Sequence, residues 1–181
     1  QTPLMALQKL DRQHLIYRNL SPQRYKQIIG HRSHITGGGM FSLLLNNQGA
    51  IRSCGVNDLG RLGLGDEVHR HVPVAITSLS QHHIVAVAAG TEHSVAITRL
   101  GLVFTWGYGR SGQLGHGDNS RQDIPRLLTS IQHTYRIVGA ACGGQHTLLV
   151  TDLGQVLAFG CSDEGQLGLG DTDDRHMPCL V

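Results

Sequence analysis

The chain has 181 residues, enough for one compact domain; its 24 glycines lie well above ordinary usage, and its net charge is only +2. With 5 prolines, no Gly-X-Y period and 40% hydrophobic residues, the composition excludes a collagen helix and a disordered chain. The charge is too small to indicate direct binding to nucleic acid, and no apolar run is long enough for a transmembrane segment.

The first 34 residues form a leader that differs from the rest of the chain. Residues 1–36 carry six lysines and arginines against a single acid, whereas the remainder contains no lysine. Leucine and isoleucine residues at loosely helical spacing predict a helix over residues 4–19. The pair Ser21-Pro22, followed by Gly30, predicts a second helix over residues 22–29. We expect this basic leader to pack on the adjoining domain or to dock a partner.

A glycine-rich segment recurs three times in the rest of the chain. The copies are residues 54–66, 106–118 and 159–171, so the repeat interval is 52 and then 53 residues. Other positions keep the same register, namely Gly38, Gly90 and Gly143; Gly49, Gly101 and Gly154; and Pro73, Pro125 and Pro178. So many aligned positions indicate repeated structural units rather than chance.

The middle unit shows the structure expected of each repeat. Residues 93–98 form a β-branched run typical of a strand, and residues 102–106 form a second strand. The short turn between them, which contains Gly101, predicts a β-hairpin. The glycine-dense stretch 107–118 suits neither a strand nor a helix, and we expect a loop in which the Asp118 carboxylate caps turn amides.

Two further apolar runs complete the unit. Residues 124–128 tolerate Pro125 only at a sheet edge or a strand start, and residues 135–142 lead into the next repeat. About four short strands in roughly 50 residues are typical of a propeller blade, and such blades must stack to bury both faces. We therefore predict an all-β fold, in which residues 35–181 form about three β-propeller blades of four antiparallel strands. The approximate units are 35–86, 87–139 and 140–181.

These units resemble the regulator-of-chromosome-condensation repeat. The pattern is Gly-x-x-His-Ser/Thr, an apolar strand, an aromatic residue followed by Gly, and then Gly-Gln-Leu-Gly-x-Gly-Asp. The middle unit matches at Gly90, His93, Ser94, Trp106, Gly107, Gly112, Gln113, Leu114, Gly115, Gly117 and Asp118. The third unit matches at Gly143, His146, Thr147, Phe159, Gly160, Gly165, Gln166, Leu167, Gly168, Gly170 and Asp171. The family usually closes a seven-bladed ring, so three units imply a piece of a longer protein, assembly with other chains, or covered ends.

The first copy departs from this pattern. Phe41 stands where the later units have histidine, Cys54 replaces the aromatic residue, and Arg61 replaces glutamine. Such departures are typical of a terminal, capping repeat.

The recurring residues are expected to hold the repeats together rather than to carry out chemistry. The predicted structural positions are Gly55, His93, Trp106, Gly107, Gly115, Gly117, Asp118, His146, Phe159, Gly160, Gly168, Gly170 and Asp171. A buried histidine that recurs once per unit is expected to bond the backbone of a neighbouring loop and so to join blade to blade.

Several patterns that suggest a cofactor or metal fail on inspection. The stretch 107–112 satisfies Gly-x-Gly-x-x-Gly, but more glycines follow it in place of a helix. The twelve histidines and four cysteines show no known zinc spacing, and the cysteines are read as free thiols of a reducing compartment. We therefore expect no cofactor, no metal, no small-molecule substrate and no catalytic residue.

The loops of the units are the predicted partner contacts. The candidate residues are Asp58, Arg61, Arg110, Asp163, Glu164, Asp173 and Asp174. The resemblance implies a protein-binding propeller that regulates or scaffolds a partner, such as a Ran-like small GTPase undergoing nucleotide exchange. The alternative is a non-catalytic adaptor in a ubiquitin ligase, trafficking or organelle-assembly complex, because fold alone does not determine function. The absence of a signal and the cysteine usage predict an intracellular location, in cytoplasm or nucleus.

Overall fold

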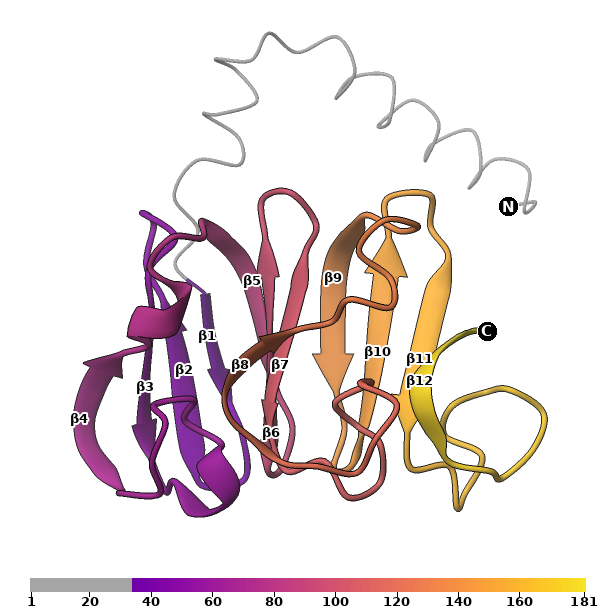
Figure 1. Ribbon diagram of the computed structural model, residues 1–181, viewed down its shortest axis with the longest axis horizontal. Coiled ribbons are helices and arrows are strands. Elements are labelled where there is room, and N and C mark those ends of the chain that lie inside the picture. The colour runs from indigo at the N-terminus through magenta and orange to yellow at the C-terminus, as the bar shows by residue number, and fades with distance from the viewer. Residues whose placement is uncertain (1–33) are drawn as a thin grey trace, which may run out of the picture. The chain divides into compact units, whose positions relative to one another are not determined.

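The computed structural model describes residues 34–181, and the two helices predicted in the leader lie outside the described residues. Figure 1 shows three four-stranded antiparallel sheets that follow one another along the chain. The first sheet comprises β1 (His34–Gly37), β2 (Phe41–Leu45), β3 (Ile51–Gly55) and β4 (Arg70–Ala75). The second comprises β5 (Ile84–Ala89), β6 (His93–Thr98), β7 (Val103–Gly107) and β8 (Gln122–Leu127). The third comprises β9 (Ile137–Cys142), β10 (His146–Thr151), β11 (Val156–Gly160) and β12 (Arg175–Leu180).

The sheets are arranged radially, which confirms the predicted propeller blades. Within each sheet the strands pair in chain order, and the first strands β1, β5 and β9 of successive sheets contact one another. The fourth strands lie at the opposite, outer edge. We call the three sheets blade 1, blade 2 and blade 3. In the described part of the chain, two short 3-10 helices, η1 (Asp58–Gly60) and η2 (Thr77–Leu79), are the only helical turns, and none is long and apolar enough to cross a membrane.

The hairpin predicted from residues 93–106 is present as β6 and β7. The run 135–142, however, contributes β9, which begins the third sheet rather than ending the second. Each blade thus takes its inner strand from the apolar run that precedes the recurring Gly-x-x motif. The outer strand is instead the proline-containing one, because Pro73, Pro125 and Pro178 fall in β4, β8 and β12. Proline cannot donate to a neighbouring strand, so it is tolerated at this edge and protects it from further pairing.

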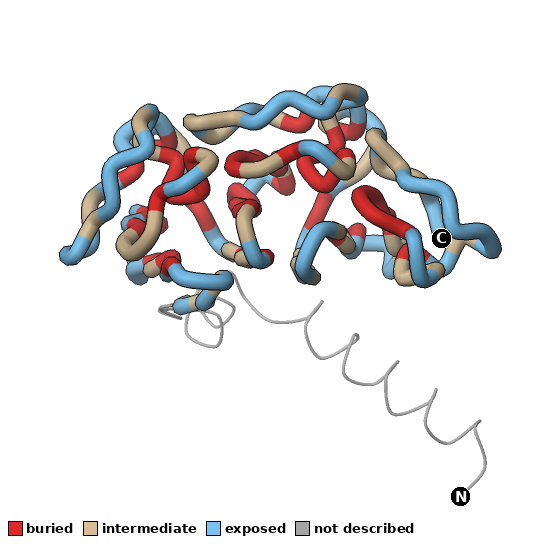
Figure 2. The backbone as a smooth tube through the Cα atoms, turned by 90° about the horizontal axis from the view of Figure 1, so that it is seen from below, coloured by how far each residue is buried: buried red, intermediate tan, exposed pale blue. Residues whose placement is uncertain are grey.

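Apolar side chains fill the two spaces between blades. Between blades 1 and 2, the buried side chains include Phe41, Leu43, Leu45, Ala96, Phe104 and Trp106. Between blades 2 and 3, they include Val95, Ile97, Val103, Leu149, Leu157 and Phe159. Figure 2 shows the buried residues gathered between neighbouring sheets. Each fully buried side chain of this size contributes about 1.5–3 kcal/mol through removal of apolar surface from water.

The glycine that ends the third strand of each blade has a steric role. At Gly107, φ is +99°, and a Cβ atom built there would lie 2.4 Å from the carbonyl oxygen of Glu92. Gly55 and Gly160 are in the same situation, with φ of +112° and +109°. Only glycine lets the end of the third strand lie this close to the connection between the first and second strands of the same blade.

Candidate partner-binding face

The glycine loops of the three blades lie at one end of the molecule. Because the strands alternate in direction, the connection between the first and second strands of each blade and that between its third and fourth strands emerge at the same edge, at the bottom of Figure 1. We call the loops 56–69, 108–121 and 161–174 the loop end. The tight turns 46–50, 99–102 and 152–155 lie at the opposite edge, which we call the hairpin end.

A shared framework closes each loop. The recurring aspartates Asp66, Asp118 and Asp171 accept backbone amide protons from the residue two positions ahead, at 2.9, 2.9 and 3.1 Å. Each also pairs with an arginine of the adjoining fourth strand, namely Arg70, Arg126 and Arg175. These backbone hydrogen bonds, with the arginines, hold the pKa of all three carboxyls below the ordinary value. The aspartates therefore fix the backbone of the loops, as the turn-capping prediction for Asp118 expects.

Blade-to-blade hydrogen bonds hold the loops against the next sheet. The carbonyl oxygen of Arg61 accepts from Ser94 Oγ at 2.9 Å and from Trp106 Nε1 at 3.0 Å. At the following junction, Thr147 Oγ1 donates to the carbonyl oxygen of Gln113 at 2.9 Å. The same carbonyl in the first two glycine loops is thus bonded by the second strand of the next blade.

His93 of blade 2 takes part in the junction with blade 3. Its ring bonds a side-chain hydroxyl of blade 3, whereas we expected a bond to the backbone of a neighbouring loop. Its Nε2 lies 2.9 Å from Thr147 Oγ1, and the ring is fully buried. The single hydroxyl proton of Thr147 goes to Gln113, so Nε2 must donate and Nδ1 carries the lone pair. Nδ1 is buried without a partner, and burial lowers the pKa of His93 to about 4. The corresponding His146 is only partly buried, and its ring makes no hydrogen bond to a residue of the described range 34–181.

Arg61 does not fit the expectation of a partner contact. Its side chain is 4% exposed; Nε donates to the Asp58 carbonyl at 2.8 Å, and Nη2 lies 3.4 Å from Glu92 Oε1. The repeat explains this placement, because the equivalent Gln113 is also buried. Arg61 is therefore a bridge between blades 1 and 2.

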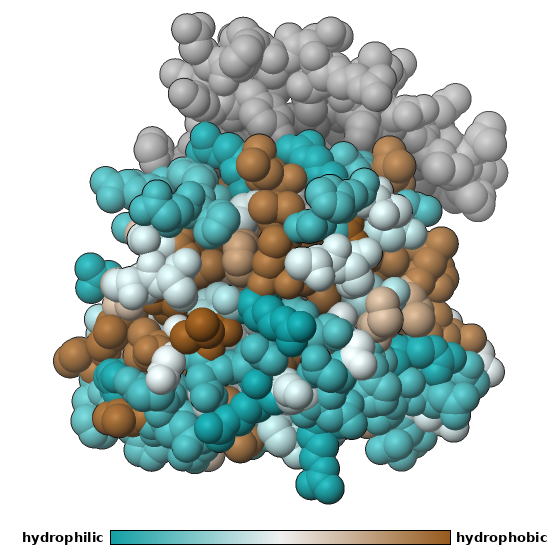
Figure 3. All heavy atoms as spheres, in the orientation of Figure 1, coloured by the Kyte–Doolittle hydropathy of each residue, from teal (hydrophilic) through white to brown (hydrophobic). Residues whose placement is uncertain are grey.

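The remaining candidates are exposed at the loop tips. Asp58, Arg110 and Asp163 occupy the same position in successive loops, and all three are exposed. The loop 161–174 carries five carboxylates and no cationic side chain. The exposed acids in it are Asp163, Glu164, Asp171, Asp173 and Asp174. Figure 3 shows mainly hydrophilic residues along the lower edge of the visible face. The framework is thus repeated, whereas the tip of the second loop presents a positive charge where the first and third present a negative one.

One group within the third loop has the composition of a metal site. Cys161, Asp163 and Asp174 place one ligand atom each within 4.8 Å of one another, and the described residues contain no other group of this kind. Cys161 Sγ lies 3.4 Å from Asp163, and Asp174 accepts the Ser162 amide at 2.8 Å. Sequence reasoning missed the group because Asp174 is distant from Cys161 along the chain. These mutual hydrogen bonds account for the arrangement as loop structure.

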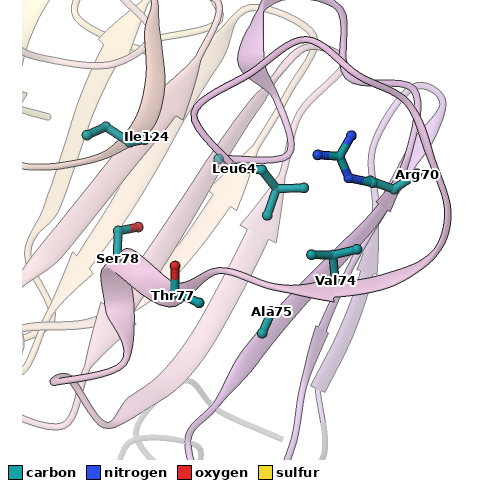
Figure 4. Close-up of a pocket in the computed structure, with 8 residues that line it drawn as sticks. Leu64, Arg70, Val74, Ala75, Thr77, Ser78 and Ile124 are labelled. Atoms are coloured by element: carbon teal, nitrogen blue, oxygen red, sulfur yellow. The ribbon is translucent and has the colours of Figure 1, made fainter.

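A pocket of about 270 Å³ lies on the outer rim between blades 1 and 2. Figure 4 shows its lining, which comprises Gly63, Leu64, Arg70, Val74, Ala75, Thr77, Ser78 and Ile124. The polar lining consists of one guanidinium and two hydroxyls, which do not form a nucleophile and base pair.

Comparison with known proteins supports the family suggested by the repeats. The model described as "Regulator of chromosome condensation (RCC1) repeat" matches residues 48–97, 101–150 and 154–181, and a second model of the same description matches residues 84–113 and 137–166.

Two curated relatives are similar to most of the chain. The probable E3 ubiquitin-protein ligase HERC4 of Mus musculus is 39% identical over 163 residues, which are 89% of this chain and 15% of the relative. The ultraviolet-B receptor UVR8 of Arabidopsis thaliana is 39% identical over 145 residues, which are 80% of this chain and 33% of the receptor. The chain therefore spans a third or less of the length of these relatives.

Solved structures agree with the described fold. Human WBSCR16 has a TM-score of 0.73 at 26% identity, and Prp20p of Saccharomyces cerevisiae has 0.73 at 21% identity. Each comparison covers 82% of this chain and 37% of the other chain. The Prp20p likeness at this identity concerns the fold alone. On the repeat matches and the three stacked blades, the chain belongs to the RCC1 repeat family.

Proposed function

We propose that this chain is a protein-interaction propeller segment that recognises its partner through the loop end. The observation that carries the proposal is the contrast between framework and tips. The aspartate turns repeat in each loop and the blade-to-blade bonds repeat at both junctions, whereas Arg110 presents a positive charge at the position where Asp58 and Asp163 present a negative one. A rigid scaffold with variable exposed loops is the usual arrangement of binding surfaces.

The chemistry of the third loop favours a cationic partner. Five carboxylates lie in the loop 161–174, and the nearby Arg175 bonds only Asp171 among their side chains. Glu164 and Asp173 are exposed, and their carboxylates make no hydrogen bond to a described residue. Uncompensated charges at a rim attract an oppositely charged surface and accelerate encounter, with a marked dependence on salt.

The finer proposal is an adaptor that holds a protein for a ubiquitin-ligase-type assembly. It is supported by the 39% identity to HERC4 across 89% of this chain. Nucleotide exchange on a Ran-like GTPase is the second candidate. The Prp20p structure, described with its binding to Gsp1p and histones, supports it only through the fold. Exchange needs no covalent chemistry, because a factor that binds the nucleotide-free GTPase more tightly lowers nucleotide affinity.

Charge-reversal variants test the loop end as the binding surface. The variant Glu164→Lys with Asp173→Lys alters two exposed acids outside the loop framework. The control, Gln48→Lys with Asp152→Lys, makes a similar change of charge at the hairpin end. Quantitative affinity enrichment is expected to show partners that the loop-end variant loses and the control retains, with binding that weakens as salt rises. Equal retention by both variants contradicts the proposal.

A nucleotide-release assay separates the two finer candidates. A panel of small GTPases, including Ran, is loaded with a fluorescent guanine nucleotide and mixed with the intact protein. Binding without accelerated release supports the adaptor, whereas catalytic release from one GTPase supports exchange.

A further inference from the structure

The outward face of blade 1 differs from the two faces that its fellow blades bury. In blades 2 and 3, one row of cross-strand neighbours points to the preceding blade. This row is Val87, Ala96, Phe104 and Leu127 in blade 2, and Ala140, Leu149, Leu157 and Leu180 in blade 3. In blade 1 the register is identical, and the row reads Ile35, Leu44, Arg52 and Ala75. An arginine therefore stands where the occupied faces have Phe104 and Leu157.

A second row changes in the same way. It is Ala89, Ser94 and Trp106 in blade 2, and Cys142, Thr147 and Phe159 in blade 3. Blade 1 has Gly37, Ser42 and Cys54. The hydroxyl that bonds the preceding blade's loop is thus retained as Ser42, whereas the aromatic ring is lost.

The occupied faces show what these positions do when a blade covers them. Trp106 and Phe159 are fully buried, Phe104 is 7% exposed, and the His82 ring of the inter-blade linker packs on Phe104 with centroids 4.8 Å apart. In blade 1, by contrast, Ile35 is 78% exposed, and Ser42 and Arg52 are exposed. No described carboxylate pairs with Arg52.

The outward face of blade 1 therefore retains features of a surface that packs against another blade, but its two altered positions change which neighbouring side chains can pack there. Ser42, Leu44 and Ile35 retain the hydroxyl and apolar surface of a packing face. An apolar neighbour opposite Arg52 would bury an unpaired guanidinium, which is strongly unfavourable. It would also leave a void over Cys54, where a large ring is absent.

We propose that the outward face of blade 1 is a selective interface for a β-sheet blade that places a carboxylate opposite Arg52 and a bulky apolar side chain over Cys54. The two blade junctions in this chain supply the geometry, and the guanidinium supplies the charge requirement. By the position of His82, the carboxylate belongs to the linker that follows the partner blade's outer strand.

The same device keeps copies of this chain apart. The following face of blade 3 carries Leu148, Val150 and Val156, which correspond in register to Val95, Ile97 and Val103 of blade 2. Those three are fully or almost fully buried in the core between blades 2 and 3. Blade 3 therefore presents a packing face that a standard blade would accept, and heterologous contacts of this kind join copies head to tail. Arg52 and Cys54 make blade 1 a poor acceptor for it.

Sedimentation analysis tests the rejection. The unmodified chain is expected to remain monomeric, whereas Arg52→Phe with Cys54→Trp, which copies blade 2, is expected to form oligomers whose mass rises with concentration. Adding Val150→Asp on blade 3 should return that variant to a monomer. A restored variant that stays monomeric, or an unmodified chain that self-associates equally, overturns the proposal.

A transplant within the chain tests the carboxylate requirement. Phe104→Arg places at the junction between blades 1 and 2 the arginine that blade 1 has at the equivalent position 52. Because the guanidinium would be buried there without a partner, the variant is expected to unfold at a lower urea concentration. His82→Glu in that background should recover part of the loss, whereas His82→Glu alone should recover nothing. His82→Gln in the Phe104→Arg background is the uncharged control. Rescue by glutamine equal to that by glutamate, or no rescue by either, contradicts the requirement for a carboxylate.

Discussion

At the scale of single residues, the buried His93 makes the stability of the fold depend on pH. Its pKa in the folded chain is about 4, below the ordinary 6.5, so the unfolded chain binds the proton first. The stability should be complete above about pH 6.5 and should fall as the pH drops toward 4, by about 3 kcal/mol for this group. His116, whose pKa burial also lowers to about 4, acts in the same direction.

The variant His93→Phe tests this dependence. Phenylalanine occupies the equivalent position in blade 1 as Phe41, so the substitution is compatible with the fold. Urea unfolding at pH 7 and at pH 5 should show a smaller loss of stability for the variant than for the unmodified chain. The exposed His133→Gln serves as the control, and a variant whose loss at pH 5 is unchanged would contradict the account.

Gly107 supplies a second prediction at this scale. Gly107→Ala brings a Cβ to 2.4 Å from a backbone oxygen at φ +99°, and it should lower the free energy of unfolding by more than about 2 kcal/mol. Gly154→Ala, where φ is +80° but nothing lies within 4 Å, should lose only about 1 kcal/mol. Equal losses in chemical denaturation would show that the close approach does not matter.

Residue roles could be predicted from the sequence only where they repeat. Asp118 as a turn cap and His93 as a blade-to-blade residue follow from their recurrence, but the Thr147 partner of His93 belongs to another unit. Arg61 shows the limit most clearly. A charged residue in a glycine loop predicts exposure, whereas Glu92 of the next blade and the Asp58 carbonyl hold it inside.

At the scale of elements, the junction between blades depends on one aromatic side chain from the third strand. Trp106→Phe keeps the ring, as at Phe159, and removes the hydrogen bond to the Arg61 carbonyl, so it should lower stability by about 1 kcal/mol. Trp106→Cys, which copies blade 1, should lose about 3–5 kcal/mol because the core loses the ring. Urea midpoints within error of each other for the two variants would be inconsistent with this packing.

Strands could be predicted well because their signals are local. The β-branched run 93–98 and Pro125 identify a paired strand and an edge strand without tertiary information. The assignment of the run 135–142 to a blade could not be made in this way. Its pairing with β10 rather than with β8 depends on which neighbour lies across the loop, and that is a tertiary property.

At the scale of the whole molecule, the interval of about 50 residues between repeats predicts stacked blades, and the recurring glycine pattern indicates the family. The charge difference among the loop tips is also visible in the sequence. Neither the rim pocket nor the grouping of Cys161 with Asp174 is visible there, because each depends on side chains brought together from separate segments. The proposed function rests on the gathering of the three glycine loops at one end of the molecule.

Hydrogen–deuterium exchange on the complex tests the central claim, partner recognition by the loop end, most directly. The intact protein is compared alone and with the partner that the control variant retains and the loop-end variant loses. The account predicts slowed amide exchange in residues 108–121 and 161–174, with the turns 99–102 and 152–155 unchanged. Slowed exchange confined to those turns, with the glycine loops unaffected, would contradict it.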